Sequence, residues 1–544
     1  MPSRSTCLAG LLALLLAPAV AAADGFELEG DLEYRADTTY INPFELGGTA
    51  VRHATWTDQR LRTDWRLRHA GTVELHLQAD LLSGVLFGDT GSFGGDPSTN
   101  SGVSIATKQP NTTSWEIGLR EGADPLDPDS YVPVLRGAEP VLINHAYADA
   151  FLPFGLLRVG RQPLSYGANL SSHEGTRINR WGVSRFVDSV DRVMFATKLD
   201  EVYLALREGP GHKPNLALDD GVFLAVFHDW LNQRSIFSLG DDTRQIGAAL
   251  QLRRPRLALM GAVFEDVFLS ASVIRLSDDI FNSHVWALPL KAEGRVGPLA
   301  VSTQLMLIRG SSREVSEGFA ALAKTEAVQQ DIRALGAQAI VDYDMGPVTA
   351  TLEVDYASGD DDPRPETPIT QFSFARDLNV GLLLFEQIMA FESARSAAVG
   401  IENLAGMGAA SFPLTEVASD GRFSNAIALF PQVGVRLFEG PGQRLRSRSG
   451  VLFAWPAADG VVDPIMTVLG EDGDDISDDA VNFHGGRPGH YYGTELDQQL
   501  EWTFRERFVW TLEAAVLLPG SSLENEHGKA VNAFLIDNRF TYLF

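Results

Sequence analysis

Apolar and polar residues alternate through most of the chain with the two-residue period of a β-strand. Residues 60–68 show this most clearly: the charged positions are Arg60, Arg62, Asp64, Arg66 and Arg68, and the apolar ones are Leu61, Trp65 and Leu67. A face this charged must meet water, because unpaired charge is prohibitively costly in a dry core. The apolar face needs hydrocarbon or a second sheet. The pattern therefore predicts strands with one wet face and one apolar face.

The strand predicted over residues 534–544 has an aromatic face. Its apolar positions are Phe534, Ile536, Phe540, Tyr542 and Phe544, interrupted by Asn538. This is typical of the closing strand of an outer-membrane barrel, and the alternative is a buried strand of a soluble sandwich. A barrel satisfies both faces and leaves no strand edge unpaired. We therefore expect an all-β fold, a transmembrane antiparallel β-barrel of about 18 strands (18–20) with long extracellular loops.

Turn signals give the expected topology. Tight turns are predicted near Ala70, Pro153, Asp200, Pro255, Gly297, Gly346, Gly440 and Arg505. Long connections are predicted between them, including 83–140, 162–190, 208–220, 268–280, 358–424 and 456–491, with a helix in 311–330. In residues 208–242 the two segments Gly221–Leu231 and Ser235–Leu239 are either barrel strands, giving 20, or a hairpin in an external loop, giving 18.

The N-terminal segment has the form of a secretory signal peptide. Arg4 precedes an apolar run over 8–17, and small residues follow at 21–23. We expect residues 1–23 to be removed and residues 24–544 to form the barrel. Cys7, the single cysteine, lies in the removed part. The barrel would therefore have neither disulfides nor thiolate metal sites.

Composition narrows the function. The net charge of −27 argues against nucleic-acid binding, which needs clustered positive charge. A barrel of this size leaves an aqueous channel, so we expect passive passage of hydrophilic, charged solutes. The eleven histidines fall in no nucleophile or metal motif. We expect no enzyme activity, no cofactor and no bound metal.

Three short motifs carry a family resemblance. Gly160-Arg-Gln-Pro-Leu-Ser-Tyr-Gly167 ends one predicted strand, Arg185-Phe-Val-Asp188 begins the next, and Asp355-Tyr-Ala-Ser-Gly-Asp360 ends a later one. This order resembles the alginate-export porins of Gram-negative outer membranes. The resemblance implies an 18-stranded barrel with a charged lumen that passes an anionic polysaccharide or other small solutes. The chain departs from the family's pattern after Asp360, where residues 368–374 replace the expected segment.

Strand parity selects the candidate pore-lining residues, which are Arg60, Arg62, Arg66, Arg68, Arg158 and Gln162. The four arginines in 60–68 form either a ladder for carboxylates or phosphates or a set of pairs with neighbouring Asp and Glu. Arg161 falls on the predicted lipid face, which requires a bulge or a place near the outer rim.

Residues 378–391 are the most apolar stretch after the signal. We expect them to fold inward, with Leu382, Leu383, Leu384 and Phe385 as a constriction and a helix over 382–397. An apolar constriction would favour apolar solutes, so a hydrophobe channel gated by this segment is one alternative. A closed, surface-binding barrel is another.

The expected partners follow from the location. These are outer-membrane lipid and lipopolysaccharide, a small or oligosaccharide solute and periplasmic assembly partners, with both termini in the periplasm. Acidic clusters at 360–362 and 471–479 are either divalent-cation sites or solvated loops, and the second does not match a calcium-binding loop.

Overall fold

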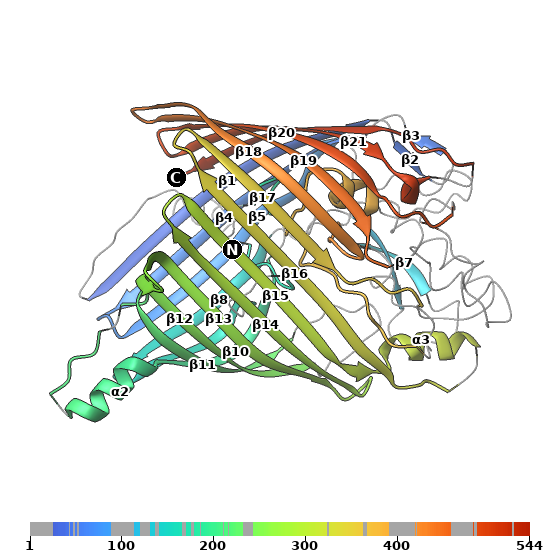
Figure 1. Ribbon diagram of the computed structural model, residues 1–544. Helices are drawn as coiled ribbons and strands as arrows, with labels where there is room; N and C mark the ends of the chain where they lie inside the picture. The colour runs from blue at the N-terminus through green and yellow to red at the C-terminus, as the bar shows by residue number, and fades with distance from the viewer. Residues whose placement is uncertain are drawn as a thin grey trace, which may run out of the picture.

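The computed structural model of the chain is a closed antiparallel β-barrel of 18 strands, which confirms the predicted fold (Figure 1). The structure describes residues 25–42, 44–46, 49–51, 54–88, 114–119, 131–136, 141–165, 170–175, 179–184, 187–209, 211–215, 217–231, 243–323, 326–362, 367–390, 419, 421–458, 482, 487–524 and 527–544. The predicted signal segment, residues 1–23, lies outside these residues.

Each barrel strand pairs antiparallel with its neighbour in the chain, and β22 pairs with β1 to close the ring. The strands are β1 (Phe26–Asn42), β4 (Ala54–His69), β5 (Val73–Gly88), β8 (Val141–Leu152), β9 (Gly155–Pro163), β10 (Ser189–Lys198), β11 (Gly221–Trp230), β12 (Arg244–Leu259), β13 (Ala262–Asp278), β14 (Ser283–Val296), β15 (Leu299–Ser312), β16 (Gln330–Asp344), β17 (Val348–Ala357), β18 (Ala426–Gly440), β19 (Gln443–Pro456), β20 (Gly493–Phe504), β21 (Phe508–Pro519) and β22 (Ala533–Leu543).

Strand β22 shows how the two faces divide. Ile536, Phe540 and Tyr542 are exposed on the outside, whereas Asp537 and Arg539 are buried on the inside. Asn538 is the one polar residue that interrupts the aromatic stripe of β22, and a hydrogen bond accounts for it. Asn538 accepts a hydrogen bond from the indole nitrogen of Trp510 on β21 at 2.8 Å. The aromatic stripe of the sequence is therefore the outer surface of the barrel.

The same division holds around the ring. Inward positions of β5 are polar and buried, such as Glu74 and Gln78, while its outward positions Leu75 and Leu77 are exposed. Exposed apolar side chains continue on the outer faces of other strands, for example Val159, Val226, Leu269, Val354, Val433 and Leu496. An apolar exterior around a charged interior is the reverse of a soluble protein and matches a barrel in hydrocarbon.

Three parts of the predicted topology are wrong, and two of them concern β12 and β13. Pro255 lies inside β12 and not at a turn, and the strand continues to the turn at Met260 and Gly261. The missing N–H of Pro255 removes no hydrogen bond to either neighbouring strand. On one side, β11 begins opposite Arg253 and does not reach Pro255. On the other side, the facing Asp266 of β13 has a left-handed φ of 52° beside a register shift. Residues 268–280 are likewise strand β13 as far as Asp278, not a long loop.

The predicted tight turn near Asp200 is a helix, α2 (Leu199–Glu208), which directly follows β10. The next barrel strand is β11, so Gly221–Trp230 belongs to the barrel and not to a hairpin in an external loop, and the barrel has 18 strands. Residues 235–239 lie outside the described part of the chain.

The remaining elements lie at the two ends and inside the barrel. They are the hairpins β2 (Phe44–Leu46)–β3 (Thr49–Val51) and β6 (Ser114–Leu119)–β7 (Tyr131–Arg136), helix α3 (Glu314–Ala323), the π-helical turn η2 (Leu384–Met389) and the 3-10 turn η3 (Ser521–Leu523). Helix α3 confirms the helix expected in 311–330. In the described residues no helix is long and apolar enough to cross a bilayer.

Candidate functional site

The connection between β9 and β10 folds into the barrel and is fastened to its inner wall. The main-chain oxygen of Gly175 accepts a hydrogen bond from Arg62 at 2.6 Å. The main-chain oxygen of Ser184 accepts hydrogen bonds from Arg35 at 3.0 Å and from Arg60 at 3.2 Å. Arginines on β1 and β4 therefore anchor this loop through its carbonyl groups.

The same arginines form ion pairs with carboxylates on the wall. Arg60 lies 2.6 Å from Glu33, and Arg62 makes a bidentate pair with Asp80 at 2.6 and 2.8 Å. Both arginines are less than a tenth exposed, so neither faces open lumen. Of the two alternatives predicted for these arginines, Arg60 and Arg62 follow the second: they pair with neighbouring carboxylates of the barrel wall.

The other two arginines of β4, Arg66 and Arg68, lie nearer the end of the barrel where short hairpin turns such as 70–72 join the strands. Arg68 lies 2.8 Å from Glu74 and 3.4 Å from Glu29. Arg66 is exposed on the inner face. Within the predicted ladder, Arg66 and the half-exposed Arg68 are therefore the cations that a solute could reach.

Strand β9 places its residues as parity predicts. Arg158 points inward and makes a bidentate pair with Asp149 at 2.6 and 2.7 Å, and Gln162 is buried and donates to the main-chain oxygen of Arg192 at 3.0 Å. Arg161 points outward and is paired with Asp191 at 3.0 Å, near the end of β9 where the long connection begins. The ion pair with Asp191 compensates the charge of Arg161 on the outer face. The position of Arg161 near the end of β9 agrees with the place near the outer rim that was predicted for it.

Residues 378–390 also lie inside the barrel. Leu382, Leu383, Leu384 and Phe385 are 0–4% exposed and pack against the apolar upper wall, which includes Phe430, Leu452 and Tyr492. The helix expected over 382–397 is present as the π-helical turn η2 and Ala390, and residues beyond 390 lie outside the described part. The apolar side chains of this segment face the wall and not open space.

A single carboxylate fixes the start of that helical turn. Glu495 on β20 accepts hydrogen bonds from the backbone N–H groups of Leu382 at 2.7 Å, Leu383 at 2.8 Å and Leu384 at 2.6 Å. Glu495 is fully buried. Charge-assisted hydrogen bonds at a helix N-terminus are among the stronger ones in proteins, and they compensate the burial of this charge.

The turn that delivers these N–H groups depends on a glycine. Gly381 has a left-handed φ of +80°, and a Cβ there would lie 2.9 Å from both Glu495 and Leu452. Glycine therefore meets a conformational and a steric requirement at once.

The two segments contact each other inside the barrel. Asn179 donates to the main-chain oxygen of Asp377 at 2.6 Å, and Asn379 donates to that of Trp181 at 3.1 Å. Trp181 is fully buried and its indole donates to Gln432 at 3.1 Å. We call residues 170–175, 179–184 and 374–390 the inward segments. They join β1 and β4 to β18 and β20, which lie a few strands away round the ring.

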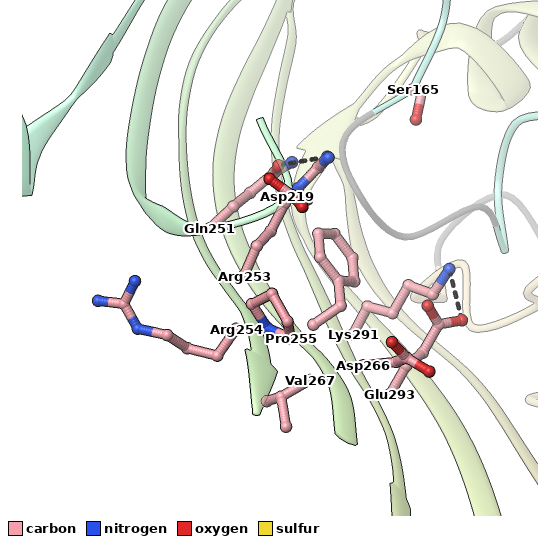
Figure 2. A pocket seen from close by; sticks show the side chains of 11 residues that line it. Ser165, Asp219, Gln251, Arg253, Arg254, Pro255, Asp266, Val267, Lys291 and Glu293 are labelled. Atoms are coloured by element: carbon pink, nitrogen blue, oxygen red, sulfur yellow. Dashed lines mark hydrogen bonds and ion pairs between the residues drawn. The ribbon is translucent and has the colours of Figure 1, made fainter. Parts of the chain in front are cut away.

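A polar cavity of about 530 Å³ lies against β12, β13 and β14 (Figure 2). Its cations Arg253 and Lys291 both lie near the Phe268 ring, 5.2 and 5.6 Å from the ring centre. Lys291 is paired with Glu293 at 2.9 Å. The Nε atom of Arg253 is buried and has no hydrogen-bond partner among the described residues. A small charged solute could contact both cations here.

Sequence reasoning missed this cavity. Reading Pro255 as a turn split β12 in two, which hid the inward position of Arg253. The inward parity of Gln251, Arg253, Lys291 and Glu293 was the signal that could have found it.

The other candidate sites contain no reactive pair or metal cluster within the described residues. Ser184 and His173 are in contact at 3.1 Å, but both are buried beneath the inward segments. Asp360 accepts hydrogen bonds from the N–H groups of Thr370 and Asp362, while burial raises the pKa of its carboxyl. No group of three metal-ligating side chains occurs in this part of the chain. Residues 471–479 lie outside it.

No family model and no curated protein matches the chain. Among solved structures, it is similar to the outer membrane protein OprD from Pseudomonas aeruginosa, with 11% identity over 97% of each chain and a TM-score of 0.43. A BenF-like porin from Pseudomonas fluorescens Pf-5 has 10% identity over 95% of this chain and 98% of that chain, with a TM-score of 0.46. OccK2 (OpdF) from Pseudomonas aeruginosa has 12% identity over 95% and 97%, with a TM-score of 0.44.

These findings correct the family expected from the sequence. The matching structures are OprD and Occ porins, a different family from the alginate-export porins, so the alginate-export resemblance is wrong. The motifs that suggested it are short, and they lie at the ends of β9 and β17, where unrelated barrels also need a strand to stop and the chain to turn inward.

Proposed function

We propose that the chain forms an outer-membrane channel for the passive passage of hydrophilic, charged solutes. The observation that supports this most strongly is the division of the barrel into an apolar exterior and a charged interior. Eighteen strands enclose more space than their own side chains fill, so water and solute can occupy the lumen. Passage needs no catalytic group, because charged side chains and a constriction set selectivity.

The orientation follows from the connections. The start of β1 and the end of β22 lie at the same end as the hairpin turns at residues 70–72, 297–298 and 505–507. In outer-membrane barrels this end faces the periplasm. The long connections that contain β2–β3, β6–β7 and α3 would then face outside the cell (Figure 1).

The inward segments narrow the lumen, and the cavity at β12–β14 supplies a contact for solute on the hairpin side of them. Arg253 and Lys291 are its inward cations (Figure 2), and the ring of Phe268 lies near both and partly shields them from water. Partly desolvated cations attract anions more strongly than cations in bulk water do. The carboxylates of Asp219, Asp266 and Glu293 also line the cavity, so it can contact charged groups of either sign, with Arg253 and Lys291 as the contacts for anionic ones.

The alternative of a hydrophobe channel is less well supported. Its apolar gate would use Leu382–Phe385, but these side chains are 0–4% exposed because they pack against the wall. An apolar solute would have to displace them to reach their surface.

The experiment is a bilayer recording of refolded residues 24–544 under a salt gradient. Removing both cavity cations, in Arg253→Gln/Lys291→Gln, should shift the reversal potential toward cation preference. The matched control is the outward-facing pair Arg275→Gln/Arg161→Gln, which removes the same charge from the outer surface. Arg275 stacks over Trp286 at 5.9 Å on that surface.

An unchanged reversal potential in the lumen variant would remove the cavity from the pathway. An equal shift in both variants would show that total charge, and not the cavity, sets selectivity. Absence of current in the unmodified chain would favour a closed, surface-binding barrel.

A further inference from the structure

Helix α2 exposes apolar side chains, which would be unfavourable if the helix were surrounded by water alone. Its residues Leu199, Val202, Tyr203 and Leu206 form one apolar stripe at helical spacing. Glu201 and Glu208 lie on the opposite face, and Asp200 and Arg207 flank the stripe. Tyr203 is 63% exposed and Leu206 is 82% exposed. A helix on a soluble surface normally turns such a stripe toward the protein.

Three charged side chains of α2 have partners in the chain. His212, in the connection that follows the helix, lies 2.8 Å from Glu201 and 3.0 Å from Glu208. Asp200 accepts a hydrogen bond from the backbone N–H of Val222 at 3.3 Å, at the start of β11. Asp200, Glu201 and Glu208 thus have partners within the chain, whereas Tyr203 and Leu206 of the apolar stripe are left to the surroundings.

The position of α2 indicates what those surroundings are. The helix continues directly from β10 at the rim of the barrel, at the same end as the C-terminus and away from α3 (Figure 1). The neighbouring turns on both sides also project apolar side chains. Phe154 in the β8–β9 turn is 62% exposed, and Met260 in the β12–β13 turn is 99% exposed. Leu218, just before β11, is 68% exposed.

These residues form an arc at the edge of the outer apolar surface of the barrel. We propose that α2 is a membrane-surface anchor, whose apolar stripe lies in the boundary between headgroups and acyl chains of the leaflet on the hairpin side. The chemistry fits a lipid surface, because an interfacial helix presents an apolar stripe to lipid while its polar groups stay hydrated or paired. The lipid-facing band of the barrel is continuous with the arc through β10 and β11.

The inference rests on the proposed membrane location, but not on solute passage. The experiment separates the two with spin labels on single cysteines in refolded residues 24–544, from which Cys7 is absent. Labels are placed at Leu206→Cys on the stripe, at Arg207→Cys beside it and at Val226→Cys on the outer wall of β11. The barrel is reconstituted in phosphatidylethanolamine–phosphatidylglycerol vesicles, and accessibility to oxygen and to a water-soluble nickel chelate is measured.

The account predicts a several-fold higher oxygen-to-nickel ratio at Leu206→Cys than at Arg207→Cys, approaching the ratio at Val226→Cys. Equal, water-like ratios at the two α2 positions would overturn the anchor while Val226→Cys still reported a barrel in lipid. Shielding of Leu206→Cys from both reagents would also overturn it, in favour of a protein partner on the stripe. Water-like ratios at all three positions would instead refute the membrane location.

Discussion

Replacing Glu495 by glutamine should loosen the inward segments and raise the ionic current. The carboxylate holds three backbone N–H groups at 2.6–2.8 Å in a fully buried site. Glutamine keeps one oxygen and puts an amide NH2 where the second oxygen stood, so at least one N–H group loses its acceptor and faces another donor.

The magnitude follows from the bonds that are lost. Hydrogen bonds to charged groups contribute about 1.5–3 kcal/mol each, and an unsatisfied buried donor costs about 1–3 kcal/mol. We therefore expect docking of residues 382–390 to weaken by about 2–4 kcal/mol. Because each 1.4 kcal/mol is about a factor of ten, the undocked fraction should rise by about one to three orders of magnitude.

Single-channel recording is the assay. Glu495→Gln should show a higher mean conductance or frequent steps to a larger open level, with melting of the barrel still cooperative. Glu501→Gln, which removes the same charge from the same strand but accepts no hydrogen bond from the inward segments, should keep the steadiness of the unmodified channel. Gly381→Ala places a methyl group against Glu495 and Leu452 and so disturbs the same contact from the side of the inward segment. It should reproduce the conductance steps of Glu495→Gln.

If both Glu495→Gln and Gly381→Ala fold and conduct as steadily as the unmodified chain, the inward segments do not limit the current. The reasoning from the buried carboxylate to the constriction would then be refuted.

Two further outcomes are expected. Arg62→Gln should destabilise the barrel by about 3–5 kcal/mol in a urea titration, because it leaves the buried Asp80 without its partner, whereas Arg66→Gln at an exposed position should change stability little; equal effects would contradict the assignment of the two arginines. Hydrogen bonds to Glu201 and Glu208 raise the pKa of His212 in the folded chain. The stabilisation of α2 by protonated His212 is therefore fully present below the pKa that His212 has in the unfolded chain, and it is lost as pH rises through the higher folded pKa. Hydrogen exchange in α2 should therefore quicken as pH rises through that window, beyond the intrinsic rate increase, and a His212→Gln variant should not show this excess.

Much of the barrel was predictable because its pattern is local. The period of two placed the aromatic face of β22 outside and the charged face of β4 inside, and closure requires an even number of strands in such a barrel. The inward direction of Arg158 and the outward direction of Arg161 also follow from parity alone.

Other features depend on contacts that local pattern does not contain. Helix α2 was taken for a turn because ten residues fit either period too briefly to decide. Pro255 was taken for a turn because its place opposite a bulge on β13 is visible only after the strands pair. The hydrogen bond from Arg62 to Gly175 joins residues far apart in the chain, and it exists because the β9–β10 connection folds inward.

The most direct test of the account is whether the refolded, unmodified chain conducts ions across a planar bilayer. The proposed channel predicts a steady current at constant voltage, with a reversal potential under a salt gradient that moves when the cations at Arg253 and Lys291 are removed. A well-folded barrel that inserts and carries no current would contradict the central claim.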